Sequence, residues 1–385
     1  MMINVNELTM KKMILFAAAA CVALASCVKN EITPEGESES NVLSYQAVIG
    51  KAVSRAQTDY KTNYKNVPFG SYAFFLANGK NWDTDKATAE MYINNAAISY
   101  DESGSTLQGI TFAADTWHDA TTVHYWPKQG SLTFFAYSPK TLPTGASLTC
   151  TKDDGIKVTG FNVNTISNTD FMVAEIAKDR TANSTTGGTT LGGDKSYYRT
   201  GVPTLFKHKL TQIGFTVKTD RDYTNDHDGT ANKKYQAGDK VIKLTGITIE
   251  KVKNTGTYTQ TPTESWSAQT GSVDYTHFSG NQAVTSTAVT AKNANAQTIM
   301  LPQTFSTDDQ LVEITYTITT YTSENDSTTE TVTETKKLKE LGNWEINKNI
   351  TYGITINLAG TDGSGVILWD PAVEDWTPTD NGITI

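Results

Sequence analysis

The sequence predicts an all-β protein built from antiparallel β-sandwiches, and three observations support this fold class. Apolar and polar residues alternate with a period of two in several segments, for example from Val312 to Ile318 and from Ile350 to Leu358, which is typical of strands with one buried face. Turn-forming residues separate these segments at short intervals. No segment shows helical periodicity beyond a turn or two. Because helices are lacking to cover a parallel sheet, packed antiparallel sheets are expected.

The first set of predicted strands begins after residue 41. Within Val42 to Val53, apolar residues fall on one side of the two-residue period from Leu43 to Ile49, with Ser44 and Gln46 opposite. Further strand signals, each bounded by turn residues, are Phe69 to Leu76, Met91 to Tyr100, Thr121 to Trp126, Ser131 to Ser138, Ile156 to Phe161 and Asp170 to Glu175. These strands predict an N-terminal sandwich domain over residues 42–204.

The second set of predicted strands begins near Leu205. Val241 to Ile249 alternates with a phase slip at Gly246, which indicates a β-bulge. Together with the two regular segments named above, this set predicts a C-terminal sandwich domain over residues 205–365. The remaining residues, 366–385, form a C-terminal extension.

The N-terminus has the features of a bacterial lipoprotein signal. Lys11 and Lys12 precede a short apolar run, which ends in Leu24-Ala25-Ser26-Cys27. A basic start, an apolar stretch and small residues before a cleavage site make a secretory signal that is too short to remain as a membrane span. Cys27 at this position predicts a lipobox whose thiolate receives a diacylglyceryl group. The alternative is a plain signal peptide that carries a cysteine by chance.

Several further features bound the class of protein. The leader comprises residues 1–27, and Met10 is its expected true start. Residues 28–41 are polar and acidic, which predicts a flexible tether. The net charge of -9 argues against nucleic acid and anionic membrane surfaces as partners. Once Cys21 leaves with the leader and Cys27 is acylated, Cys150 has no partner for a disulfide, so packed sheets must supply the stability.

No catalytic or metal-binding constellation emerges, and we expect neither enzymatic activity nor a cofactor. His118 and His124 lack a third ligand in the sequence pattern. The stretch Asp226 to Gly229 departs from a calcium loop at its first and last ligand positions. The glycine-rich stretch Thr181 to Lys195 lacks the lysine of a phosphate loop and predicts a surface loop. Asp153 and Asp154 fit a turn.

Several short motifs occur in order along the chain. They are Tyr125-Trp126-Pro127, Leu132 to Pro139, Thr169 to Ala174, Leu205 to Leu210, Met300 to Gln303, the residues Trp344, Asn349 and Tyr352, and Val373 to Trp376. Together with the lipobox, this order resembles the Mfa-like fimbrillin family, which comprises the lipoprotein pilins of Bacteroidales type V pili. The resemblance covers nearly the whole chain.

The resemblance implies two transthyretin-like β-sandwich domains in tandem and a structural or accessory role in a type V pilus that serves adhesion. It places the protein in the outer membrane, exposed at the cell surface, and in the fimbrium after processing. The implied partners are other pilin subunits, the outer membrane through the lipid, and an Arg-specific surface protease. It does not distinguish a stalk, a tip or an anchor subunit.

The resemblance also assigns roles to both ends of the chain. The polar segment after the first strand contains the bond between Arg55 and Ala56, where the surface protease would cut and release strand 42–53. The alternative is that Arg55 is an ordinary exposed basic residue. After the glycine-rich residues 359–365, the apolar extension would act as a donor strand in a neighbouring subunit. The alternative is that it forms the last edge strand of its own domain. Its candidate donor residues are Val366, Ile367, Leu368, Trp369, Val373 and Trp376.

A second class of function remains open on the sequence. The chain contains 7 Trp and 17 Tyr residues, and exposed aromatic side chains can bind sugars or proteins. The alternative reading is therefore a monomeric surface lipoprotein that binds a glycan or a host ligand. Aromatics inside strand patterns, such as Tyr125 and Trp126, are more simply explained as core residues.

Overall fold

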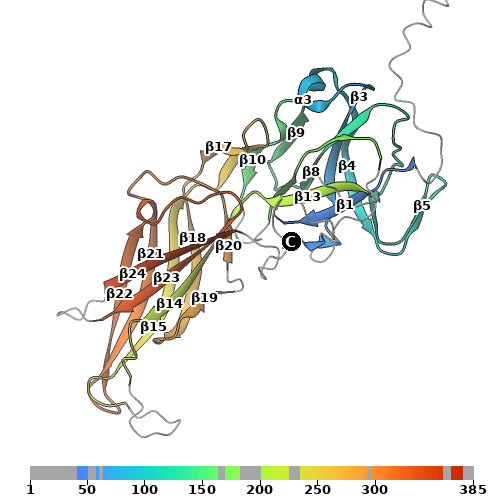
Figure 1. Cartoon of the computed structure of the whole chain (residues 1–385). Coiled ribbons are helices and arrows are strands. Elements are labelled where there is room, and N and C mark those ends of the chain that lie inside the picture. Colours follow the sequence, from blue (N-terminus) through green and yellow to red (C-terminus); the bar gives the residue numbers. More distant parts are fainter. Residues whose placement is uncertain are drawn as a thin grey trace, which may run out of the picture.

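The computed structural model describes residues 41–50, 58–59, 64–163, 170–182, 201–224, 235–293, 297–358 and 366–375. Regular structure in these residues is almost entirely β-strand and forms two lobes (Figure 1). The first lobe is drawn mainly in blue to green and the second mainly in yellow to red. The predicted all-β fold class is confirmed.

The first lobe contains a large sheet with the strand order β11-β13-β1-β7-β4-β3-β8-β12, in which β2 also pairs with β1. Because β11 pairs with β8 as well as β13, the run of strands closes on itself. The strands are β1 (Tyr45–Ile49), β2 (Thr58–Asp59), β3 (Phe69–Leu76), β4 (Glu90–Asp101), β7 (Thr116–Asp119), β8 (Ser131–Ser138), β11 (Met172–Ala174), β12 (Ala177–Arg180) and β13 (Val202–His208).

A second sheet of the first lobe joins distant parts of the chain. Its order is β17-β16-β10-β9, with β9 (Ser147–Thr151), β10 (Gly155–Asn162), β16 (Thr255–Thr259) and β17 (Ser265–Thr270). Smaller elements complete the lobe: the hairpin of β5 (Ser105–Leu107) and β6 (Ile110–Phe112), helix α3 (Trp82–Asp85) and the 3-10 turn η2 (Lys86–Thr88). The chain therefore returns to the first lobe after it has begun the second.

The second lobe is a sandwich of two sheets. One has the order β19-β14-β23-β24, with β20 also paired to β14, and the other has the order β18-β15-β21-β22. The first comprises β14 (Thr211–Thr219), β19 (Val289–Ala291), β20 (Gln297–Met300), β23 (Lys348–Asn357) and β24 (Val366–Asp375). The second comprises β15 (Lys240–Val252), β18 (Val273–Val284), β21 (Leu311–Tyr321) and β22 (Ser327–Lys337), and the turn η4 (Leu338–Glu340) follows it.

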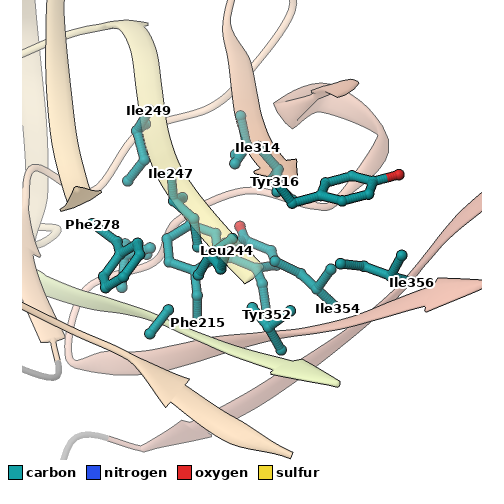
Figure 2. Packing of buried hydrophobic residues seen from close by; sticks show 14 of the residues in the cluster. Phe215, Leu244, Ile247, Ile249, Phe278, Ile314, Tyr316, Tyr352, Ile354 and Ile356 are labelled. Carbon is teal, nitrogen blue, oxygen red and sulfur yellow. The ribbon is translucent and has the colours of Figure 1, made fainter. Parts of the chain in front are cut away.

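The core of the second lobe lies between these two sheets (Figure 2). Phe215 and Tyr352 come from one sheet, Leu244 and Tyr316 from the other, and all four are buried. Every second residue of β21 and β23 faces this core, as the alternation in the sequence predicts. The hydrophobic pattern is thus the direct cause of the two-layer arrangement.

Two strand pairings differ from the expected antiparallel arrangement. β1 pairs in parallel with β13, and β14 pairs in parallel with β23. A parallel pair needs a long crossover, and in both cases many intervening strands supply it. The sheets are therefore mixed, with antiparallel pairs in the majority.

Several local predictions can be compared with the structure. Phe69–Leu76 and Ser131–Ser138 are strands with the predicted bounds. The predicted bulge at Gly246 is confirmed, because the register of β15 against both neighbours shifts between Leu244 and Gly246. The strand predicted over Thr121 to Trp126 is wrong: this segment is a loop with one isolated bridge to Val42.

The boundary between the lobes also differs from the expected position. The split after residue 204 falls inside β13, which belongs to the first lobe. The chain instead passes between the lobes at Lys209 and Leu210, since β14 begins at Thr211. Turn residues do not mark this crossing, so sequence pattern alone does not place it.

Candidate assembly site

The strand β1 lies completely inside the first lobe. All five of its residues are buried, and none of Ala47, Val48 and Ile49 exceeds 2% exposure. Tyr45 lies edge-on to Phe69 at 5.7 Å between ring centroids. Burial raises the pKa of the Tyr45 hydroxyl above its ordinary value. A strand this deeply packed stabilises the lobe mainly through its apolar side chains.

β1 is paired along both of its edges. It forms a parallel ladder with β13 from Tyr45 opposite Val202 to Ile49 opposite Phe206. On the other edge it pairs with β7 through Tyr45 and Trp117, and with β2. If β1 left, it would expose a slot between β13 and β7 with unpaired backbone groups and apolar walls. An open edge of this kind strongly favours the addition of another strand.

The residues just before β1 are held by the loop that follows β7. The backbone N–H of Leu43 donates to the carbonyl of His124 at 2.8 Å, and that of Trp126 donates to the carbonyl of Asn41 at 2.9 Å. The ring Nε2 of His124 lies 2.9 Å from the carboxylate of Asp119. Asp119 also accepts hydrogen bonds from the N–H and hydroxyl of Thr121, both at 2.8 Å. These side-chain bonds replace ladder bonds, which explains why this segment is a loop.

Asp119 therefore holds the entry of β1 in place. Burial alone would raise its pKa, but the hydrogen bonds from His124 and Thr121 outweigh burial and lower the pKa from 3.8 to about 2. A carboxyl whose pKa is depressed in the folded state stabilises the fold above its unfolded pKa. That stabilisation is lost as the pH falls toward the folded value.

We expect Asp119→Ala to lower the free energy of unfolding by about 1–3 kcal/mol at pH 7, because the hydrogen bonds that His124 and Thr121 make to this buried carboxylate are lost. The difference from the wild type should shrink as the pH falls from 3.8 to about 2, since the wild-type carboxylate then becomes protonated. Urea unfolding at pH 7 and pH 3 measures the free energy of unfolding of the wild type and of the variant. An equal difference at both pH values would contradict the role assigned to the ionised carboxylate.

The candidate donor segment forms β24, an edge strand of the second lobe. It pairs antiparallel with β23 over 10 residues, from Val366 opposite Asn357 to Asp375 opposite Lys348. Ile367 and Trp369 are half-buried against the core of the lobe. In this chain the segment is therefore the last edge strand of its own lobe. To act as a donor strand in a neighbouring subunit, it would have to separate from β23.

β24 also carries an unusual amount of exposed apolar surface. Leu368 is 56% exposed and Val373 is 57% exposed, and both are large side chains. The strand forms the outer edge of its sheet and has no further described neighbour. Pro371 lacks the N–H that a central strand would need, so the part of β24 from this residue onward suits an edge position. Trp376, also predicted as a donor residue, lies outside the described residues.

β22, one of the two edge strands of the opposite sheet, is built differently. Glu330, Glu334 and Lys336 of β22 lie directly opposite the buried residues Ile318, Ile314 and Val312 of β21, and so share the inner face. Charged side chains that point inward on an edge strand discourage pairing with another chain. Of the two edge strands β22 and β24, β24 is thus the one whose side chains favour pairing with a strand of another chain.

Cys27, Arg55 and Ala56 lie outside the described residues, as does the glycine-rich segment 359–365. The predicted strand 42–53 is described as far as Gly50, and its regular part is β1.

The junction between the lobes is fixed by residues that the sequence pattern does not single out. The backbone N–H of Lys209 donates to the carbonyl of Phe171 at 2.8 Å, and its carbonyl accepts from the indole N–H of Trp266 at 2.6 Å. Its ammonium lies 2.6 Å from the carboxylate of Glu264. Burial lowers the pKa of Lys209, while Glu264 opposes this shift. The only signal in the sequence is the Leu205 to Leu210 motif that contains Lys209.

The other candidate residues have structural roles. Trp126 is buried in the core of the first lobe, as predicted for core packing. His118 lies 3.2 Å from Asp101, and His208 lies 2.7 Å from buried Asp170. Within the described residues, no group of three or more His, Cys, Asp or Glu side chains is placed to hold a metal ion. No helix in the described part of the chain has the length and apolar character to cross a membrane.

The two remaining predictions concern Cys150 and the paired aspartates. Cys150 is a buried free thiol that packs with the apolar residues of the first lobe, and burial raises its pKa. Asp153 and Asp154 lie in the turn between β9 and β10, as predicted, where Asp153 contacts Lys86 at 3.3 Å. Cys150 therefore lacks the exposed position of a reactive thiol.

Comparison with known proteins agrees with this architecture. A solved fimbrial protein from Bacteroides vulgatus superposes with a TM-score of 0.57 at 18% sequence identity, covering 88% of this chain and 100% of that chain. A candidate cell adhesion protein from Bacteroides uniformis gives a TM-score of 0.42 at 17% identity, covering 87% of this chain and 98% of that chain. The search of curated proteins found no significant match.

The family assignment rests on a different comparison. The sequence model of the fimbrillin-like family matches residues 73–376, which is most of the chain and includes nearly all strands of both lobes. The likeness to the Bacteroides vulgatus structure independently supports the fold. This protein therefore belongs to the fimbrillin-like family.

Proposed function

We propose that this protein is a pilus subunit that polymerises by strand exchange at the cell surface. It is exported as a lipoprotein anchored through Cys27 and is cleaved between Arg55 and Ala56 by an Arg-specific protease. The lipidated N-terminal part, which contains β1, then leaves the first lobe. The C-terminal strand of a neighbouring subunit fills the slot that β1 vacates. Its partners are thus other pilin subunits, the protease and the outer membrane.

The observation that carries this proposal is the placement of β1. It is a separate, fully buried strand near the N-terminus, paired on both edges, and Arg55 lies shortly after its end. Its alternating core residues are Tyr45, Ala47 and Ile49. β24 has the same kind of alternation, with Ile367 and Trp369 on one face. A strand with apolar residues at every second position can present the same kind of core-facing side as β1.

Cleavage controls assembly in this proposal through competition between strands. While β1 is covalently attached, its high effective concentration keeps it in the slot, and a neighbour's strand cannot displace it. After cleavage between Arg55 and Ala56, β1 is no longer held near the slot. Its departure becomes irreversible because the released peptide is diluted or stays in the membrane through its lipid. The exposed slot then gains stability from any complementary strand that pairs with β13 and β7.

We expect Cys27→Ser to abolish lipid labelling and to leave precursor in the inner membrane or periplasm. Each buried methylene of an acyl chain contributes about 0.8 kcal/mol, so stable anchoring depends on the chains attached at this thiol. Metabolic labelling with a fatty acid, followed by cell fractionation, measures both effects. Normal amounts of the variant at the outer surface would contradict the lipoprotein assignment.

A further inference from the structure

The second lobe contains a cavity beside the end of β14 and the start of β15. Its volume is about 540 Å³, which lies within the range of small-ligand sites. Three segments form its walls: residues 219–224 after β14, residues 235–242 at the start of β15, and residues 283–287 between β18 and β19. This cavity is separate from the β1 slot and from β24.

Hydrogen bonds between the three segments shape the cavity in advance of any ligand. The carboxylate of Asp222 accepts the backbone N–H of Ser286 at 3.0 Å. The hydroxyl of Thr224 donates to the carbonyl of Lys240 at 2.7 Å. The N–H of Thr219 donates to the carbonyl of Thr285 at 2.8 Å. Because these bonds cross between segments, the walls hold their positions without a ligand.

One wall presents a preformed aromatic platform. Tyr235 lines the cavity and stacks on Tyr321 at 3.9 Å between centroids, with only 14° between the ring planes. Both rings are partly exposed. Tyr321 stacks on one face of the Tyr235 ring, so only the opposite face can receive a ligand. The negative face of an aromatic ring attracts the partly positive C–H groups of a ligand.

The rest of the lining combines an apolar floor with a few polar groups. Ile242 and Val284 are buried core residues that form part of the floor. Asp222 and Lys240 contribute one negative and one positive charge, so the cavity does not favour a strongly charged ligand. Thr219, 1% exposed, also lines it, and its hydroxyl makes no hydrogen bond with any residue in the described part of the chain. A buried hydroxyl of this kind gains from a ligand or water that supplies a partner.

We propose that this cavity binds a neutral pyranose, such as the terminal sugar of a glycan. A pyranose ring carries C–H groups on one face, which suit the Tyr235 platform. It carries several hydroxyls around its rim, which suit the carboxylate of Asp222 and the hydroxyls of the threonines. A peptide or an acidic ligand would use fewer of these features. The proposal concerns a separate activity of the second lobe and does not depend on strand exchange.

Saturation-transfer NMR on the full mature chain tests this proposal. The probes are the methyl glycosides of galactose, glucose and N-acetylglucosamine, with choline and sialic acid as comparators. We expect transfer to the ring protons of at least one neutral glycoside. Tyr235→Ala should weaken its binding roughly 10-fold, because the stacking contact is lost, and Tyr235→Phe should retain it. Thr219→Val should keep the thermal stability, since a buried hydroxyl without a partner is replaced by a methyl group, and should reduce the affinity.

Three results would overturn the proposal. The first is the absence of transfer to all three neutral glycosides in the wild type. The second is an unchanged signal in Tyr235→Ala, which would put the contact elsewhere on the protein. The third is binding of choline or sialic acid in preference to the neutral glycosides. Circular dichroism spectra of the variants that match the wild type show that a lost signal reflects the site and not the fold.

Discussion

Arg55→Ala should leave full-length, lipidated monomer on the outer membrane and no polymer. The change removes the basic side chain that an Arg-specific protease requires, so β1 stays covalently attached and keeps the slot between β13 and β7 occupied. Because β1 is buried at every residue and paired on both edges, an intact neighbour has no open edge to join. The expected effect is a loss of essentially all multimers that resist heat and SDS.

The matched control is Lys51→Ala, which removes a nearby basic residue of the predicted strand 42–53 and spares the predicted cleavage bond. It should polymerise as the wild type does. Gel electrophoresis of unboiled surface fractions and N-terminal sequencing provide the two measurements. Polymers formed by Arg55→Ala, or a mature N-terminus other than Ala56, would contradict cleavage as the switch.

Deletion of residues 366–385 should prevent polymer formation and leave a folded monomer. The core of the second lobe is formed mainly by β14, β15, β21 and β23, and β24 adds Ile367 and Trp369, which are partly buried. The loss of their buried surface should lower the free energy of unfolding by about 2–4 kcal/mol, which is less than the roughly 5–15 kcal/mol typical of native proteins. The donor strand, in contrast, is removed completely.

A milder variant separates assembly from stability. Leu368→Asp changes a side chain that is 56% exposed in the monomer, so it should have little effect on folding and should strongly reduce assembly if this side chain enters a neighbour. Thr355→Asp, on β23 directly opposite Leu368, is the matched control and should leave assembly unchanged. Size-exclusion chromatography after protease treatment measures both. For the variant that lacks residues 366–385, outright unfolding would indicate that β24 is a purely structural edge strand.

The sequence predicts the fold class well because the two-residue period directly reflects burial. The alternation in β21 and β23 places Tyr316 and Tyr352 in the core, and the phase slip at Gly246 marks an observed bulge. In both cases a local pattern has a local physical cause. The candidate strand β24 is found in the same way, from its apolar residues after a glycine-rich segment.

Features that depend on distant residues could not be predicted in this way. The return of β16 and β17 to the first lobe is set by pairing with β10, which no local pattern encodes. The buried Lys209 contacts Glu264 and Trp266 from that return. The loop after β7 has strand-like residues, but the carboxylate of Asp119 captures its N–H groups. The aromatic pair of Tyr235 and Tyr321 likewise joins residues far apart in the chain.

The most direct test of strand exchange is to locate β24 in the assembled polymer. A photo-crosslinking amino acid at position 368 can be incorporated, activated after polymerisation, and its attachment site mapped by mass spectrometry. In mixed polymers of isotopically labelled and unlabelled subunits, we expect crosslinks between subunits to β13 (Val202–His208) or β7 (Thr116–Asp119), which flank β1. Crosslinks confined to the same subunit, at β23 beside Thr355, would contradict the proposed assembly.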